Sequence, residues 1–126
     1  LSTNGTRAPA HCTSSGQVFL AYQPPETVER IISKGLVAMT EYTITDPGKL
    51  YALLKKVREQ GYSVSIREYQ KDVASVAAPI RNACGRIVAT VSIPGPAERI
   101  AGPSLPKLIK LAVSAADSIS EQIRSR

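Results

Sequence analysis

The sequence predicts an α+β fold in which helices flank an antiparallel sheet. Apolar residues recur at helical spacing up to residue 60 and again after residue 104, and they alternate with a period of two between residues 62 and 94. Because helices come before and after the strands, we expect them to cover one face of the sheet. A chain of 126 residues has the usual size of one domain, so we interpret residues 1–126 as a single domain.

The first half of the chain contains helices with recognisable start and stop residues. Ser and Thr residues precede the first helix, Pro24 or Pro25 opens the second, and Asp46 before a proline caps the third. Gly35 and Gly61 stand where the second and third helices should end. The predicted helical ranges are 13–22, 26–34 and 47–60.

The second half of the chain reads as strands followed by one long helix. Alternating residues predict strands at 62–69, 73–81 and 86–94, and residues 82–85 have the composition of a hairpin loop. We expect Gly95-Pro96 to end the sheet and Gly102-Pro103 to precede the final helix. The apolar stripe of that helix comprises Leu105, Leu108, Ile109, Ala112, Ala116, Ile119 and Ile123.

The hairpin predicts two sheet faces of different character. If Arg81 and Arg86 close the loop, Ser75 lies opposite Ser92, and one face carries only small residues and hydroxyl groups. Such a face, to which Ser65 of the preceding strand can add a hydroxyl, indicates a pocket for a small polar molecule, although a solvent-facing sheet shows the same pattern. The first face carries Ser75, Ala77, Thr90 and Ser92, and the apolar face carries Val76, Ala78, Ile80, Ile87, Ala89, Val91 and Ile93.

The start of the first helix is a second candidate binding element. Backbone N–H groups at a helix start lack internal partners and carry the positive end of the helix dipole, so they favour anions such as a carboxylate. Thr13, Ser14 and Ser15 add hydroxyl groups, and Gly16 allows a ligand or another chain to approach the backbone. Ordinary helix capping is the alternative interpretation of the same residues.

Other functional classes have little support in the sequence. The net charge of +6 is spread over many elements, which is typical of a solvated basic surface rather than a nucleic-acid site. No apolar run reaches the length of a membrane span. His11 and Cys12 are neighbours in sequence, which does not favour a catalytic pair, and with Cys84 they form no recognisable metal-ligand set. We therefore expect no catalytic residues, metal or cofactor, and a reducing, cytoplasmic location.

A series of short motifs resembles the effector-binding domain of IclR-type bacterial transcription regulators. Their order and spacing match along nearly the whole chain. The motifs are Pro9-Ala10-His11-Cys12-Thr13-Ser14-Ser15-Gly16, Leu20-Ala21, Thr45-Asp46-Pro47, Gly61-Tyr62, Val76-Ala77-Ala78-Pro79-Ile80 and Ser92-Ile93-Pro94-Gly95-Pro96.

The resemblance implies a GAF-like domain that binds a small organic or aromatic acid and controls a separate winged helix-turn-helix, through which alone DNA is bound. It implies a dimer or tetramer, and a fragment that lacks the first strands of the sensing domain and the winged helix. The carboxylate of the effector is expected on the backbone at the helix start. The implicated residues are Thr13, Ser14, Ser15, Gly16, Ser65, Ser75 and Ser92.

Four positions depart from the family pattern. The family usually has Asp at Ser65, two acidic residues at Arg67-Glu68, Gly at Asp72 and Ser at Pro94. We therefore expect a less acidic pocket of different shape. Two alternatives stay open: an oligomerisation module that has lost effector binding, suggested by the apolar stripe of the last helix, and a Cys12-dependent enzyme.

Overall fold

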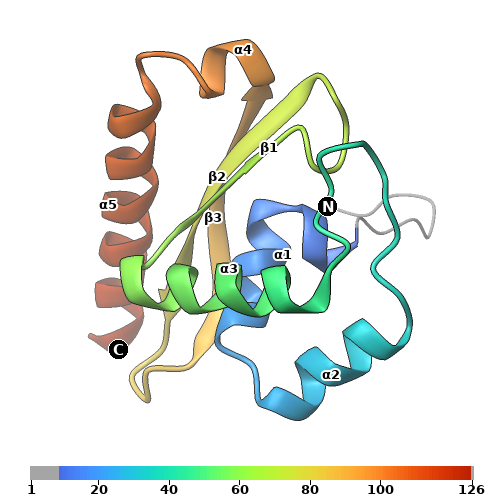
Figure 1. The fold of residues 1–126 in the computed structure, drawn as a ribbon. Coiled ribbons are helices and arrows are strands. Elements are labelled where there is room, and N and C mark those ends of the chain that lie inside the picture. Colours follow the sequence, from blue (N-terminus) through green and yellow to red (C-terminus); the bar gives the residue numbers. More distant parts are fainter. Residues whose placement is uncertain (1–8, 126) are drawn as a thin grey trace, which may run out of the picture.

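The computed structural model describes residues 9–125, which form a small antiparallel sheet between two groups of helices (Figure 1). The sheet has three strands in the order β1-β2-β3. No helix in the described part of the chain is long and apolar enough to cross a membrane. The elements are a 3-10 turn η1 (Ala10–Cys12), α1 (Ser14–Ala21), α2 (Pro25–Ser33), α3 (Pro47–Gln60), β1 (Ser63–Ile66), β2 (Val73–Arg81), β3 (Ile87–Pro96), α4 (Ala97–Ile100) and α5 (Leu105–Arg124).

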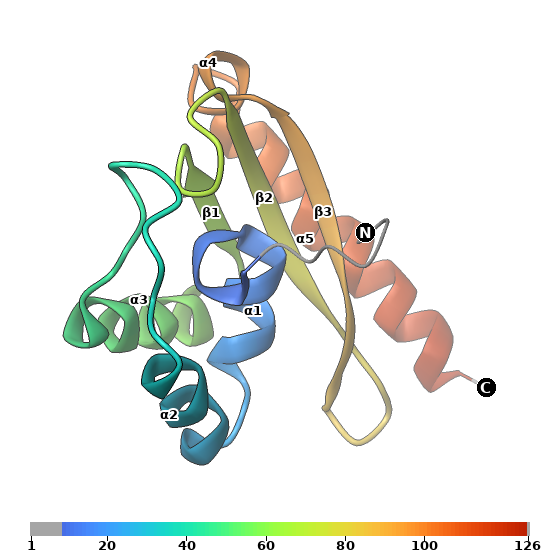
Figure 2. The same cartoon turned by 90° about the vertical axis from the view of Figure 1, so that its right-hand side faces the viewer.

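Helices lie on both faces of the sheet. Figure 2 shows α5 behind the sheet and α1, α2 and α3 on the opposite side. The α+β class with flanking helices is confirmed, but the expectation that helices cover one face only is wrong. The physical reason lies in β2, which is apolar on both of its faces, since Val76 and Ala77 are both fully buried and point to opposite sides.

Two apolar clusters hold these layers together. One joins α1, α2 and α3 to the near face of the sheet, and the other joins α4 and α5 to the far face. Burying each Leu or Val side chain contributes about 1.5–3 kcal/mol. The buried members of the first cluster are Val18, Leu20, Ala21, Val28, Leu50, Leu54, Val57 and Ala77, and those of the second are Ala74, Val76, Ala78, Ile80, Ala97, Ile100, Ala112 and Ala116.

The predicted helix boundaries agree with the structure because local residues determine them. The Thr13 side chain caps α1 by accepting a hydrogen bond from the Gly16 N–H group at 3.1 Å. Asp46 caps α3 in the same way through Lys49 at 2.9 Å, and Gly61 ends that helix with a φ angle of 83°. In α5, however, Ile119 is exposed, contrary to prediction, and the neighbouring Ser120 is buried in its place.

The hairpin register differs from prediction by two residues. Ser75 pairs with Pro94, and Ser92 pairs with Ala77, so Ser75 and Ser92 are diagonal neighbours rather than direct partners. The loop is one residue longer than expected, because Arg81 pairs with Ile87, and a bulge at Ile80/Arg81 adds a second one-residue shift. The longer loop and the bulge each displace β3 by one residue, so together they return its side chains to the predicted faces. The predicted faces are therefore confirmed from residue 89 onward.

Other predictions for the strands need correction. Ile87 is not on the apolar face, because it pairs with Arg81 on the side of α1. Strand β1 ends at Ile66, where Arg67 adopts a left-handed conformation with φ 63°. Strand β3 continues through Gly95-Pro96, which pair with the start of β2, and the short helix α4 follows.

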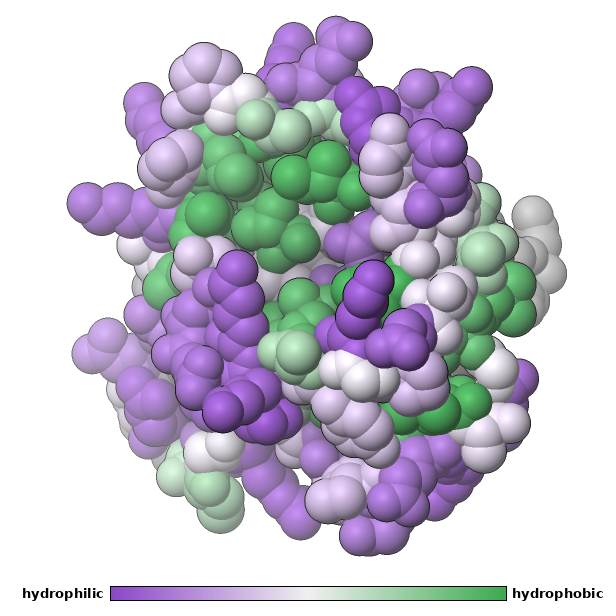
Figure 3. All heavy atoms as spheres, in the orientation of Figure 1, coloured by the Kyte–Doolittle hydropathy of each residue, from purple (hydrophilic) through white to green (hydrophobic). Residues whose placement is uncertain are grey.

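The side of β1 next to α5 is only partly covered. Figure 3 shows hydrophobic atoms gathered over β1 beside α5, bordered by hydrophilic side chains over α3. Val64 and Ile66 of β1 are half-buried there and pack against the second apolar cluster.

Candidate functional site

The start of α1 lies against the hydroxyl face of the sheet. The hydroxyl groups of Ser14 and Ser75 share a short hydrogen bond that joins α1 to β2, and Ser14 is 1% exposed. Within residues 9–125, the backbone N–H groups of Ser14 and Ser15 have no hydrogen-bond partner, whereas that of Gly16 is capped. Among the described residues, these two first-turn amides therefore remain available to bind an anion next to a sheet hydroxyl group.

Gln17 anchors this helix start from within the protein. Its side chain is fully buried and its amide nitrogen donates to the backbone carbonyl of His11 at 3.0 Å and to the Glu68 carboxylate at 2.8 Å. Its amide oxygen accepts a hydrogen bond from the Ser63 hydroxyl group at 2.6 Å. One side chain therefore ties α1 to η1, to β1 and to the segment after β1.

The residues around η1 form part of the same polar cluster. The Ser65 hydroxyl group donates to the Cys12 carbonyl at 3.1 Å, and Ser65 pairs with Ser75 across the strands. The His11 imidazole Nε2 lies 2.9 Å from the Val37 carbonyl oxygen. These contacts place η1 between the sheet and the loop that joins α2 to α3 (residues 34–46, the α2–α3 loop).

The α2–α3 loop is fastened to the turn between β1 and β2 (residues 67–72, the β1–β2 turn). The Thr40 hydroxyl group donates to the Arg67 carbonyl at 2.6 Å, and the Thr43 hydroxyl group donates to the Glu68 carbonyl at 2.5 Å. Thr43 also accepts hydrogen bonds from the N–H groups of Met39 and Thr40. Figures 1 and 2 show the loop running past α1 to meet this turn.

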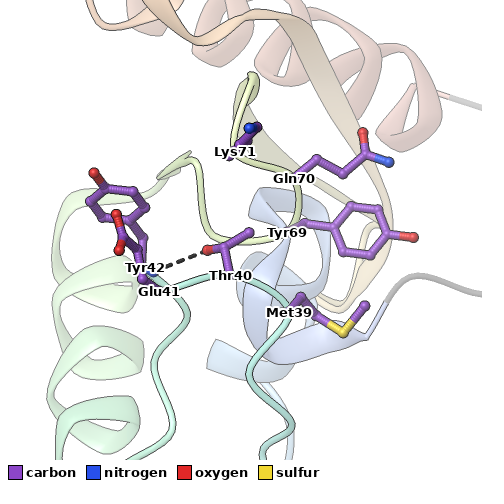
Figure 4. Close-up of a pocket in the computed structure, with 7 residues that line it drawn as sticks. All are labelled: Met39, Thr40, Glu41, Tyr42, Tyr69, Gln70 and Lys71. Atoms are coloured by element: carbon purple, nitrogen blue, oxygen red, sulfur yellow. Dashed lines mark hydrogen bonds between the residues drawn. The ribbon is translucent and has the colours of Figure 1, made fainter.

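A surface hollow of about 580 Å³ opens between the α2–α3 loop and the β1–β2 turn. In Figure 4, Tyr69 and Met39 lie on one side of Thr40, while Tyr42 and Glu41 lie on the other. The hollow offers aromatic and thioether surface next to the threonine contacts of the loop. Its lining residues are Met39, Thr40, Glu41, Tyr42, Tyr69, Gln70 and Lys71.

Glu68 is the acidic member of the polar cluster. Burial raises the pKa of its carboxyl group above the ordinary value, while the hydrogen bond from Gln17 and the nearby polar groups of Ser65 and of the Ile66 backbone oppose the shift. The carboxyl group is thus held by the Gln17 amide in a place that disfavours its charge.

The predicted binding residues occupy different situations. Ser14 and Ser75 are in direct contact, and the half-buried Ser15 follows them on α1. Ser65 is 4% exposed and uses its hydroxyl group within the protein, while Ser92 is exposed on β3. Thr13 serves as the cap.

Gly16 and Gln17 show what the sequence prediction missed. A close neighbour at Gly16 was expected to be a ligand or another chain, but it is the backbone of Ala10. Gln17 and Glu68 were not predicted as parts of the site. A polar residue just after a helix cap is usually solvent-exposed, so no sequence signal separates Gln17 from an ordinary surface residue.

Cys12 is a buried thiol of low reactivity. Burial, followed by the negative charge of Glu68, raises its pKa to about 11. At neutral pH only about one thiol in ten thousand is then ionised. Within the described residues, no group of three His, Cys, Asp or Glu side chains is arranged to hold a metal ion.

We expect Cys12 to resist alkylation in the folded domain, while the exposed Cys84 reacts. The measurement is mass spectrometry of the Cys84→Ser protein after iodoacetamide treatment at pH 7, with and without denaturant. The folded protein should carry no label and the unfolded protein one. Rapid labelling of folded Cys84→Ser protein would show that the Cys12 thiol is reactive, and it would support the thiol-enzyme alternative.

The sheet is covered by helices on both faces, and a polar helix start lies against its hydroxyl face. The chain matches the family described as "Bacterial transcriptional regulator IclR C-terminal" over residues 1–121. It therefore belongs to the family of C-terminal domains of IclR-type bacterial transcription regulators.

Individual relatives agree with this assignment. A Pca regulon regulatory protein of Pseudomonas putida is 34% identical over 90 residues, which cover 71% of this chain and 31% of that protein. The inducer-binding domain of the PobR transcription factor from Acinetobacter, solved as a double mutant with 3-hydroxybenzoic acid, is 32% identical with a TM-score of 0.78, covering 92% of this chain and 69% of that one.

A third relative shows the same fold at closer superposition. An IclR homolog from Microbacterium hydrocarbonoxydans, complexed with 4-hydroxybenzoate, is 29% identical with a TM-score of 0.86, and the match covers 100% of this chain and 52% of that one. Against curated relatives, the matched region spans between 31% and 48% of their length.

Proposed function

We propose that this domain binds a small aromatic carboxylic acid and that its occupancy controls DNA binding by a separate winged-helix domain of the full regulator. The carboxylate is held by the backbone of Thr13 to Gly16, chiefly by the N–H groups of Ser14 and Ser15. Ser75, with Ser65 and Ser92, contacts the rest of the molecule. The proposal includes a homodimer or tetramer and a cytoplasmic location, where bacterial DNA lies.

The hydrogen bond between Ser14 and Ser75 is the observation that carries this proposal. It brings the free amides of a helix start to a sheet face lined with small and hydroxyl-bearing residues. An acid can therefore meet backbone donors and a sheet hydroxyl group in one place. The hydroxybenzoates present in the two related structures belong to the same chemical class.

The first experiment is a thermal-shift measurement with benzoate, 3-hydroxybenzoate, 4-hydroxybenzoate and short 2-oxo acids. Ligand at about 100 times its dissociation constant should stabilise the domain by about 2.7 kcal/mol. The methyl ester of each effective acid serves as the control, because it keeps the shape and loses the charge. Absence of stabilisation by every acid, or equal stabilisation by the esters, would count against a carboxylate site.

We expect Ser75→Val to weaken binding of an effective acid at least about tenfold, because one hydrogen bond and the placement of Ser14 are both lost. The variant should still unfold cooperatively, at a stability reduced by about 1–3 kcal/mol for the unpaired Ser14 hydroxyl group. Thr90→Val is the matched control, since Thr90 pairs with Pro79 on the same face, further from the helix start. Titration calorimetry on both variants measures their affinities for the acid. An unchanged affinity in Ser75→Val would show that Ser75 is not part of the site.

The two alternative functions receive less support. The stripe of α5 that suggested an oligomerisation module is largely used within the domain, where Ala112 and Ala116 are buried against the sheet. A thiol enzyme is disfavoured by the buried state of Cys12. We therefore infer a regulatory rather than a catalytic role.

A further inference from the structure

Glu68 lies at the junction of three segments that surround the start of α1. Its carboxylate accepts a hydrogen bond from Gln17 of α1 at 2.8 Å, and its backbone carbonyl group accepts one from Thr43 of the α2–α3 loop at 2.5 Å. Its carboxyl group also lies near the hydroxyl group of Ser65 of β1. Among the residues named in these contacts, Glu68 is the one that is bonded both to α1 and to the α2–α3 loop.

A short series of contacts leads from this carboxyl group to the helix start. Glu68 lies near Ser65, Ser65 pairs with Ser75 on the neighbouring strand, and Ser75 is hydrogen-bonded to Ser14. Gln17 follows Ser14 by three residues and so lies on the same side of α1. The Glu68 carboxyl group is therefore joined to α1 through one side chain, and its charge already reaches Cys12, two residues before Ser14.

We propose that Glu68 is a positioning residue of the binding site, which sets the start of α1 through Gln17 and the α2–α3 loop through Thr43, and which takes up a proton when an acid binds. This inference rests on the proposed function, because it concerns the same site. It adds that ligand binding, protonation of Glu68 and the position of the α2–α3 loop depend on one another.

Electrostatics gives the direction of the linkage. A ligand carboxylate at the start of α1 is a like charge near Glu68, in surroundings that already disfavour the ionised form. Binding raises the pKa of Glu68 further, so the bound state holds more protons than the free state. By linkage, affinity for an acid increases as the pH falls through the range between the two pKa values.

Assigning the proton uptake to Glu68 requires an account of the other charged and titratable groups around it. The turn η1 contributes His11 and Cys12, while α1 and β1 contain no charged residue. The α2–α3 loop carries Glu41 and Tyr42, and Lys34 and Asp46 are its first and last residues. The β1–β2 turn carries Arg67, whose guanidinium group donates to the Lys71 carbonyl, together with Tyr69, Lys71 and Asp72.

The test is titration calorimetry with 4-hydroxybenzoate, or with the acid of the thermal-shift panel that stabilises the domain most. Wild-type protein is measured between pH 5.5 and 8, in two buffers that differ in ionisation enthalpy. We expect proton uptake on binding, and an affinity that rises as pH falls, by up to about tenfold per pH unit for one linked proton. Glu68→Gln, which keeps the side-chain shape and an acceptor for Gln17, should bind without proton uptake and with a flat pH profile.

Hydrogen exchange provides the second readout. The ligand should increase amide protection in residues 34–46 of wild-type protein, and Thr43→Val should lose most of that increase while it retains binding. Binding without proton uptake in wild-type protein, or uptake that persists in Glu68→Gln, would overturn the inference and leave the proposed function intact. Absence of binding by any acid would instead refute the proposed function itself.

Discussion

Gly16→Ala is expected to destabilise the domain by about 3 kcal/mol and to abolish acid binding at the start of α1. A Cβ atom on Gly16 would lie 2.4 Å from the carbonyl oxygen of Ala10 and 2.5 Å from its Cα atom. Both are backbone atoms of η1, so no side-chain rotation can relieve the contact. The helix start must move away from η1, and the free amides of Ser14 and Ser15 move with it.

The measurement for this variant is thermal unfolding, in which about 3 kcal/mol corresponds to a fall in Tm of about 12 °C. Gly48→Ala is the matched control, because Gly48 also lies in the first turn of a helix and its nearest contact is the Asp46 carboxylate at 3.1 Å, the end of a side chain. That control should change stability by less than about 1 kcal/mol. Wild-type stability in Gly16→Ala would show that η1 does not constrain α1.

Gln17→Leu should have an effect of similar or larger size, about 3–5 kcal/mol. Leucine fills nearly the same volume but cannot form the three hydrogen bonds of the Gln17 amide group. The Ser63 hydroxyl group, the His11 carbonyl group and the Glu68 carboxylate then lose a partner in a buried region. Each unpaired buried group costs about 1–3 kcal/mol.

Urea unfolding measures this loss as a change in the free energy of unfolding in water. Gln60→Leu provides the comparison, since Gln60 is half-buried and its side chain donates one hydrogen bond, to the Tyr62 carbonyl at 2.8 Å. That variant should lose no more than about 1 kcal/mol. Equal losses in the two variants would mean that the buried network around Gln17 adds no stability of its own.

Helix ends and sheet faces were predictable because each depends on nearby residues. Asp46 and Gly61 mark the two ends of α3 by capping and by a left-handed stop, and the structure places the helix between them. The faces of β2 follow from simple alternation. Even an incorrect register preserved the faces, since two one-residue shifts leave the parity of each position unchanged.

The features that were not predictable depend on contacts between distant segments or on backbone irregularity. The bulge at Ile80/Arg81 has no marker in the hairpin sequence, and the exposed side of α5 was misplaced because Ser120 is held by the Arg81 N–H group, 39 positions earlier. The roles of Gln17 and Glu68 require the fold to bring α1 and the β1–β2 turn together. The residue types predicted a polar site, but its internal partners needed the three-dimensional arrangement.

The contact between Ser14 and Ser75 also has a consequence for folding. The two residues are 61 positions apart, and α2, α3 and β1 lie between them in the sequence. Their contact closes a large loop of chain, at an entropic cost that the rest of the fold must offset. If the proposed acid binds at this contact, it binds the folded domain and stabilises it against the unfolded chain, in which the two residues are apart.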